Sequence, residues 1–321
     1  NGYLGNRGSF EGEFASDVHY PGTYIAGVYN KLATMVGGKR IYNNDFVNCP
    51  NWTSVELAIG CSDYVSPLKM KILSYKHRLD IKDGVVARTI IVKDTRGRVT
   101  RIKTRRIASM HDPHLCALQF DVTPLNYSGE IRIRSALDGR IINDNVARYR
   151  ELNQKHLASI SQGKTGHTVF LHTETNRSKY QIVMHAKTVV YQGKRRIRSA
   201  GEIQKGKGYI AEIFTLNVAE NTTCRLEKIV SIFTSLDDGI KNPRSAGRQA
   251  LSRIKSFSEV YRTHVRAWAN IWKIADIRIE GDRFMQKAAR LHIYHLLVAA
   301  SPHNVRIDAG ITARGLHGEA Y

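Results

Sequence analysis

Short runs of alternating or continuous apolar residues fill the chain between about residues 52 and 235. Turn residues such as Asp83-Gly84 and Asp138-Gly139 separate the runs. Alternation with a period of two is typical of strands, and the absence of helical patterns between the runs argues against a parallel sheet. The clearest predicted strands are VVARTIIV (85–92), LCALQFDV (115–122), EIRIRSAL (130–137), TVFLHTE (168–174), YIAEIFTLNV (209–218) and RLEKIVSIFT (225–234). We therefore expect a large antiparallel β-sandwich.

The apolar period changes to three or four residues after Asn242-Pro243, which predicts helices. Residues 245–275 should form one broken helix or two consecutive helices, and a third helix should cover 282–300, where Ser301-Pro302 ends it. The stripe predicted for 245–275 consists of Leu251, Ile254, Phe257 or Ser258, Tyr261, Val265, Trp268 and Ile271 or Trp272. In the third helix the residues available to face a core are Phe284, Met285, Ala288, Leu291, His295, Leu296 and Val298. Core packing is the commoner use of such stripes, ahead of partner binding.

The length of 321 residues suggests two domains, or one large β domain with an appendage, and a hydrophobic content of 42% is enough for a sizeable core. No apolar run reaches the roughly 18 to 20 residues of a membrane span, and the chain opens without a charged and apolar leader. We therefore expect a cytoplasmic protein that does not bind membranes.

A net charge of +21 raises the question of nucleic-acid binding. A dense part is RGRVTRIKTRR (96–106), in which Val99 and Ile102 alternate with cations. This pattern is typical of the solvent-exposed face of an antiparallel strand. Because no zinc-finger spacing, RNP-like motif or helix-turn-helix pattern accompanies it, we expect no specific nucleic-acid binding, only weak and salt-sensitive contact with polyanions.

Motifs for known catalytic or metal sites are absent from the sequence. Four cysteines are widely spaced without a C-x-x-C pair, so we expect buried thiols and no metal. His292 and His295 stand three residues apart without an evident third ligand, which favours histidines at the edge of a core. The opening NGYLGNRG has glycines, but it lacks the Lys-Ser/Thr of a phosphate loop. No pair of carboxylates indicates an acid and a base.

Several blocks in order resemble glycoside hydrolase family 65, which includes maltose, trehalose and kojibiose phosphorylases and acid trehalases. They are NGYLGNRGSFEG (1–12), YPGTYIAGVYNKL (20–32), DFVNCPNWTSVELAIG (45–60), YKHRLDIKDGVVAR (75–88), SMHDPHLCALQFDVTPLNYSG (109–129), SALDGRIINDNVARYRELN (135–153), and RLHIYHLLVAASPHN leading to ITARGLHGEAY. The resemblance covers nearly the whole chain.

The fold implied by the resemblance is an N-terminal β-sandwich, a helical linker and an (α/α)6 catalytic barrel. We accordingly expect a mainly β chain with the sandwich at 1–240, the linker at 241–280 and the start of the barrel at 281–321. The family's His-Phe-Trp-Asp stretch and catalytic Glu would follow the last residue, so this chain would be an N-terminal fragment, inactive alone, with no catalytic residue of its own.

The chemistry implied by the resemblance is inverting transfer of a glucosyl group from an α-linked glucose disaccharide of the maltose, trehalose or kojibiose type. A Glu would act as general acid while phosphate or an activated water attacks the opposite face of the sugar. The family's loop into the barrel corresponds here to the expected substrate-edge residues Arg314, His317, Glu319 and Tyr321. No cofactor is implied beyond inorganic phosphate as co-substrate, and a homodimer is expected for the full-length form.

Two other classes of function stay open at this stage. A stand-alone carbohydrate-binding sandwich would use exposed aromatic side chains as stacking platforms, for which Trp52, Tyr20 and Tyr24 are the candidates. A basic polyanion-binding protein would use the dispersed cations. Sugar retention by residues 1–240 alone would favour the former, and a steep salt dependence of DNA binding the latter.

Overall fold

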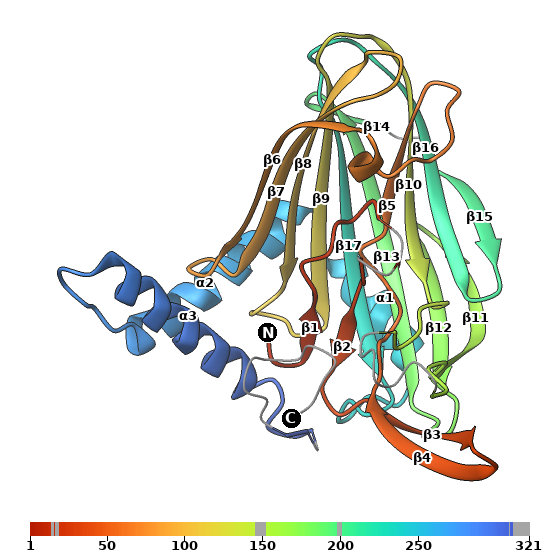
Figure 1. The fold of residues 1–321 in the computed structure, drawn as a ribbon, viewed down its shortest axis with the longest axis vertical. Helices are drawn as coiled ribbons and strands as arrows, with labels where there is room; N and C mark the ends of the chain where they lie inside the picture. Colours follow the sequence, from red (N-terminus) through yellow and green to blue (C-terminus); the bar gives the residue numbers. More distant parts are fainter. Residues whose placement is uncertain (14–15, 17–18, 145–151, 198–200, 308, 311–321) are drawn as a thin grey trace.

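A computed structural model describes residues 1–13, 16, 19–144, 152–197, 201–307, 309 and 310. Two antiparallel sheets pack face to face, and three helices follow them in the chain (Figure 1). The expectation of a mainly β fold with large antiparallel sheets followed by helices is therefore confirmed. No described helix has the length and apolar character needed to cross a membrane.

The larger sheet has nine strands. Their spatial order is β11 (Leu157–Thr165), β12 (Thr168–Thr175), β13 (Gln181–Gln192), β17 (Cys224–Thr234), β9 (Leu115–Pro124), β8 (Val99–Ala108), β7 (Val85–Lys93) and β6 (Lys71–Asp80), and the short β14 (Arg195–Ile197) pairs with β13. Each of the two outer strands contains a register shift. It lies between Ile72 and Ser74 in β6 and between Ser159 and Ser161 in β11.

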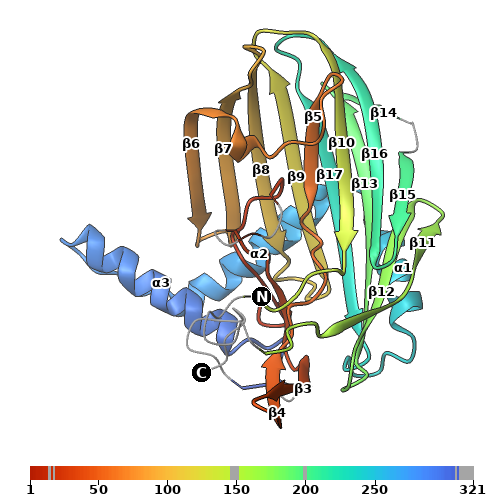
Figure 2. The same ribbon diagram turned by 45° about the vertical axis from the view of Figure 1, so that its right-hand side comes forward.

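The smaller sheet has four strands and covers part of the inner face of the larger one (Figure 2). Their order is β15 (Glu202–Gly206), β16 (Tyr209–Val218), β10 (Gly129–Asp138) and β5 (Val55–Ile59). Two separate hairpins come from the N-terminal part of the chain, β1 (Leu4–Asn6) with β2 (Thr23–Ile25) and β3 (Tyr29–Val36) with β4 (Lys39–Phe46). A single 3-10 turn, η1 (Pro67–Lys69), precedes β6.

The main core lies between the two sheets. It joins side chains such as Ile102 and Phe120 of the large sheet to Ile133 and Ile210 of the small one. A second apolar cluster lies on the other face of the large sheet, where α1 (Pro243–Arg253) and α2 (Phe257–Ala275) pack on β9, β13 and β17. Central strands of the large sheet are therefore covered on both faces, and all ten residues of β9 are buried.

Residues 245–275 form two consecutive helices, one of the two predicted arrangements. The stripe predicted for α2 is confirmed at Phe257 and Trp268, which are buried, and Tyr261 and Val265 are half-buried. The full buried set also contains Val260 and His264, which the prediction left out. Spacing by three or four residues fits the observed set equally well. The hydropathy pattern missed His264 because this residue is polar.

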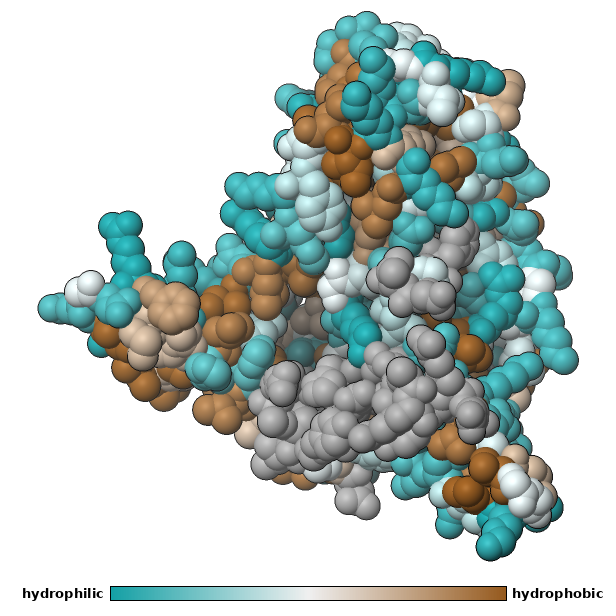
Figure 3. Space-filling view, viewed as in Figure 1, coloured by the Kyte–Doolittle hydropathy of each residue, from teal (hydrophilic) through white to brown (hydrophobic). Residues whose placement is uncertain are grey.

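The third helix, α3 (Arg283–Ala299), begins one residue after its N-cap Asp282, close to the predicted start. It projects from the sandwich and buries only Ala299 fully (Figure 1). Apolar side chains gather along this projection in Figure 3, and Phe284, Met285 and Leu296 are 77%, 50% and 64% exposed. Four of the residues available to face a core, Phe284, Met285, Leu291 and Leu296, thus face solvent, whereas Ala288, His295 and Val298 are half-buried.

The cationic segment 96–106 runs into β8, where Lys103 and Arg105 are exposed as expected. Arg105 lies over the ring of Phe257 from α2, with 5.2 Å between the guanidinium carbon and the ring centre. Arg106 contradicts the expectation of a wet face, because it is only 3% exposed. The cysteine expectation also needs one correction, since Cys61 is exposed, whereas the other three thiols are buried and all four are free.

His264 fixes α2 to two loops of the sandwich. Its Nδ1 accepts the backbone N–H of Met110 at 2.9 Å, so the proton of the neutral ring lies on Nε2, which donates to the carbonyl of Gly84 at 3.3 Å. Burial lowers the pKa of His264 to about 4. The folded protein therefore holds this imidazole neutral, and protonation would remove the Met110 contact.

Acid should weaken the docking of α2 through His264. Because its pKa is lowered from 6.5 to about 4, the unfolded chain binds the extra proton first, and stability falls as the pH drops from about 6.5 to 4. A shift of this size corresponds to roughly 3 kcal/mol. Urea titrations at pH 7 and pH 4 measure the decrease in the free energy of unfolding between the two pH values. We expect this decrease to be smaller by about that amount in His264→Gln than in the unchanged chain. Equal losses in the two proteins would contradict this role.

Candidate functional site at the junction of the sandwich and helix α3

A cleft of about 370 Å³ lies between the N-terminal segment, the β6–β7 hairpin and the helices α2 and α3. Three parts of the chain that are far apart in sequence meet here. The glycines of the opening motif, Gly2, Gly5 and Gly8, form one wall, and Trp52 contributes to the lining. Trp268 and Tyr294 bring aromatic rings from the two helices.

Two buried arginines hold the opening segment in place. Arg106 donates to the carbonyls of Arg7 and Ser9 at 2.6 and 3.2 Å, and Arg88 donates to the carbonyl of Gly8 at 2.9 Å. The segment therefore presents carbonyl oxygens to cations at these positions. A phosphate loop would instead direct backbone N–H groups toward an anion, so the arrangement agrees with the absence of a phosphate-loop motif.

Glu11 compensates the charge of these arginines. Its carboxylate lies 2.6 Å from a guanidinium nitrogen of Arg88 and 3.3 Å from one of Arg106, and it accepts the hydroxyl of Thr104 at 3.2 Å. Glu11, Arg88 and Arg106 are each at most 3% exposed. The wall of the cleft thus depends on a buried ionic cluster between the opening motif and the inner face of β7 and β8.

The aromatic wall of the cleft is closely packed. The rings of Trp268 and Tyr294 stack with 5.0 Å between centroids, and Trp272 lies 6.2 Å from Trp268 on the same helix. Burial raises the pKa of Tyr294 to about 12. Gly84 permits this packing, because a Cβ at its position would lie 2.2 Å from Nε1 of Trp268.

Polar groups of the cleft could orient a neutral ligand. The buried indole Nε1 of Trp52 and the Oδ1 of Asn6 have no hydrogen-bond partner within the described part of the chain. Burial and the neighbouring Arg88 lower the pKa of His77, which favours a neutral ring able to donate and accept. Aromatic surface beside a few unpaired donors and acceptors is typical of sites for sugars and other polyhydroxylated molecules.

A catalytic acid is missing from the described lining. None of the described residues around this cleft is Asp or Glu, and the described residues contain no group of three or more His, Cys, Asp or Glu arranged for a metal ion. General acid catalysis at this cleft would therefore need a group from elsewhere.

The predicted substrate-edge residues Arg314, His317, Glu319 and Tyr321 lie outside the described residues, so their placement stays a prediction. The expectation of exposed aromatic platforms was wrong for Trp52 and Tyr24, which are 0% and 1% exposed. The sequence alone does not show whether a large aromatic ring lies on the buried or the exposed face of a sheet. The hydroxyl of Tyr20 is occupied by contacts within the protein, since it donates to the carbonyl of Ile142 at 2.7 Å and accepts from Asn48 at 2.9 Å.

Sequence comparison adds the decisive observation. The profile described as glycosyl hydrolase family 65, N-terminal domain, matches residues 1–271. The chain belongs to glycosyl hydrolase family 65. The blocks between residues 1 and 153 that carried the resemblance, including the opening motif of the cleft, thus lie within a domain that characterises the family, whereas the two C-terminal blocks lie beyond the matched residues.

Relatives of this family 65 chain match it from end to end. An uncharacterized glycosyl hydrolase of Mycobacterium tuberculosis is 36% identical over 100% of the chain, and the kojibiose phosphorylase of Thermoanaerobacter brockii is 30% identical over the same share. The chain spans only 24% and 40% of these two relatives. A solved structure titled putative kojibiose phosphorylase from human microbiome shares the fold, with a TM-score of 0.79 and 16% identity over 93% of this chain and 38% of that one.

Proposed function

We propose that this chain is the N-terminal part of an inverting α-glucoside phosphorylase or hydrolase that acts on α-linked glucose disaccharides. The observation that carries the proposal is the end-to-end match to a family 65 relative named kojibiose phosphorylase, at 30% identity. A maltose phosphorylase of Bacillus subtilis is 26% identical over the whole chain. Maltose, trehalose and kojibiose are therefore the substrates to test first.

The proposal divides the chain into a β-sandwich at 1–240, a helical linker at 241–280 and the start of an (α/α)6 barrel at 281–321. In support, the last strand ends at Thr234, α1 begins at Pro243, and α3 contributes little to the core of the sandwich. The exposed apolar residues of α3, among them Phe284 and Leu296, would pack against further helices of such a barrel. Arg314, His317, Glu319 and Tyr321 would then lie at the edge of its sugar site.

In the proposed reaction, a glutamic acid of the barrel protonates the glycosidic oxygen while phosphate or water attacks the opposite face of the anomeric carbon. This chain would supply the sandwich against which the barrel is held. The cleft beside α3 supports such a role, because its walls come from the sandwich, the helices α2 and α3, and the family's opening motif.

Anomer-resolved NMR tests the proposed reaction. We expect the polypeptide encoded by the complete reading frame to convert one of the three disaccharides, releasing β-glucose 1-phosphate if phosphate is the acceptor. Residues 1–321 alone should show no turnover, since loss of a positioned general acid costs about 10² to 10⁴ in rate. Release of α-glucose 1-phosphate would contradict inversion, and turnover by residues 1–321 would contradict the placement of the acid outside them.

A further inference from the structure

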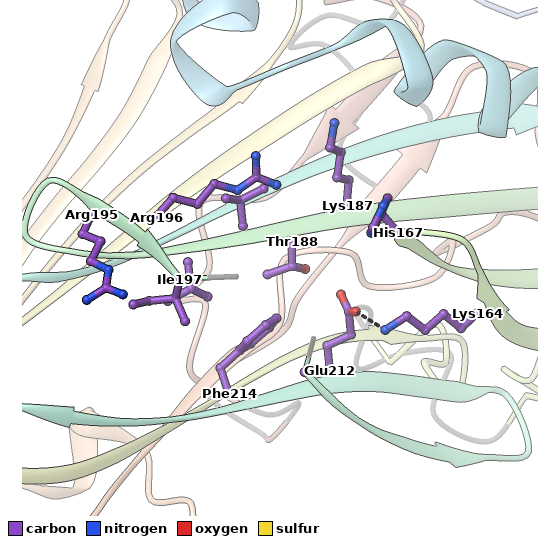
Figure 4. Close-up of a pocket in the computed structure, with 12 residues that line it drawn as sticks. Lys164, His167, Lys187, Thr188, Arg195, Arg196, Ile197, Glu212 and Phe214 are labelled. Carbon is purple, nitrogen blue, oxygen red and sulfur yellow. Dashed lines mark ion pairs between the residues drawn. The ribbon is translucent and has the colours of Figure 1, made fainter. Parts of the chain in front are cut away.

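A second and larger cavity, of about 1010 Å³, lies between the two sheets, away from the cleft beside α3. It is lined by β13 and β14 of the large sheet, by β16 of the small sheet and by the end of β11 (Figure 4). Its volume is at the upper end of the ~300 to 1,000 Å³ that small-molecule sites occupy. Nothing in the proposed reaction uses it.

Glu212 is the central polar group of this cavity. The residue is 4% exposed, and its Oε1 lies 3.5 Å from Nζ of Lys164, which reaches across from the large sheet. The other oxygen, Oε2, is buried and has no hydrogen-bond partner among the described residues. An unpaired buried carboxylate oxygen is costly, so the arrangement calls for a donor that a ligand can bring.

The side chains around Glu212 combine polar and apolar character. Figure 4 shows Thr188 and Phe214 directed into the same space as Glu212, with Ile197 beside them. The hydroxyl of Thr188 lies 3.4 Å from the hydroxyl of Ser135 and also interacts with the carboxyl group of Glu212. The cavity therefore offers a carboxylate acceptor, a lysine ammonium, a hydroxyl and an apolar wall within one space.

The other cations near the cavity differ in their contacts. Arg195 and Arg196 of β14 are exposed and line it, whereas two lysines bind protein carbonyls. Lys187 points to the opposite side of the sheet (Figure 4), where its Nζ donates to the carbonyl of Ile254 at 2.7 Å. Lys228 is fully buried and donates to the carbonyls of Ser54 and Ala136 at 3.2 and 2.6 Å. These two lysines are therefore engaged by backbone carbonyls, and the carboxylate of Glu212 would repel an anion placed beside it.

We propose that the cavity around Glu212 binds a small neutral saccharide. Sugar hydroxyls would donate to Glu212 Oε2 and accept from Lys164 and Thr188, while an apolar face of the sugar ring would pack on Phe214. An entirely apolar ligand would leave the carboxylate unpaired. A saccharide matches the groups that surround Glu212, and this site is independent of the reaction proposed above.

Titration of the 321-residue chain with maltose tests the proposal, read by amide NMR shifts. We expect saturable shifts at Thr188, Glu212 and Phe214 at millimolar maltose. Glu212→Gln should weaken binding about tenfold or more, because a hydrogen bond to a charged group is replaced by a neutral one. Glu202→Gln, an exposed glutamate on the neighbouring strand β15, is the matched control and should bind like the unchanged chain.

Thr188→Val provides a second variant with the same shape and no hydroxyl, and it should also weaken binding while the thermal midpoint stays close to that of the unchanged chain. Three results would overturn the proposal. They are no saturable shift at these residues, equal maltose binding by Glu212→Gln and Glu202→Gln, or shifts at these residues with inorganic phosphate but not with maltose. Loss of turnover in the complete enzyme would bear on the proposed reaction alone, because the shifts report this cavity directly.

Discussion

Glu11→Ala is expected to destabilise the protein by about 3 to 5 kcal/mol, the usual cost of removing one partner from a buried ionic cluster. Arg88 and Arg106 would then remain buried with two positive charges and no carboxylate between them. Their hydrogen bonds to the carbonyls of Arg7, Gly8 and Ser9 cannot replace that charge. The opening segment should therefore detach from β7 and β8.

Chemical denaturation followed by circular dichroism measures this effect. The matched control is Glu174→Ala, which removes an ion pair of 2.9 Å to Lys179, whose side chain is 64% exposed. Surface pairs of this kind contribute about 0 to 1 kcal/mol. If Glu11→Ala and Glu174→Ala unfolded at the same denaturant concentration, the buried cluster would not have the stabilising role assigned to it.

Gly84→Ala should cost a comparable amount, about 3 kcal/mol or more, through two combined effects. Gly84 has a φ of +65°, a backbone conformation in which a side chain is strained by roughly 1 to 3 kcal/mol. A Cβ there would also lie 2.2 Å from Nε1 and 2.8 Å from Cδ1 of Trp268, which is 2% exposed. Trp268 must then move, and overpacking of a core typically adds about 1 to 3 kcal/mol.

Gly97→Ala separates the two effects. Gly97 has a φ of +81° in the turn between β7 and β8, and a Cβ there would meet only Cε of Lys93 at 3.8 Å. It should therefore show backbone strain alone. We expect thermal melts to rank Gly84→Ala clearly below Gly97→Ala, and the tryptophan fluorescence of Gly84→Ala to shift as Trp268 gains solvent. Equal melting temperatures would contradict the close packing of Trp268 on this turn.

Strands with at least one buried face were predictable from sequence, whereas the exposed outer strand β6 was not. The runs at 85–92, 115–122 and 225–234 lie within β7, β9 and β17, because alternating or continuous apolar residues signal burial. The outer strand β6 was missed, since nine of its ten residues are exposed and no alternation marks them. Hydropathy reports burial, so a strand that buries almost nothing leaves no pattern.

The buried arginines on the inner face of the large sheet could not be predicted from the sequence either. Arg106 follows Ile102 and Thr104 on the inner face of β8, and Arg88 precedes Ile90 and Val92 on β7. An arginine at such a position is tolerated only because Glu11 reaches it from a distant part of the chain. Local pattern cannot reveal a partner that is separated by more than seventy residues.

The candidate site likewise combines residues that could be noticed in the sequence with an arrangement that only the fold shows. The opening glycine motif and Trp52 were both noticed in the sequence, yet their meeting with Trp268 and Tyr294 in one cleft follows only from the way α2 and α3 pack on the sandwich. Glu212 gave no sequence signal at all, because a single glutamate in a strand looks like any solvated residue. Its interest comes from burial and an unpaired oxygen, which are properties of the fold.

The outer strands of the large sheet have a consequence for solubility. An open sheet edge is a template on which a strand of another molecule can add, and bulges or charged side chains prevent such growth. Both β6 and β11 carry a register shift, and β6 also displays Lys71, Lys76 and Arg78 toward solvent. Part of the large positive charge thus lies where it opposes the addition of another strand to the nine-stranded sheet, and we expect replacement of these cations with valine or threonine to turn the edge into an aggregation site.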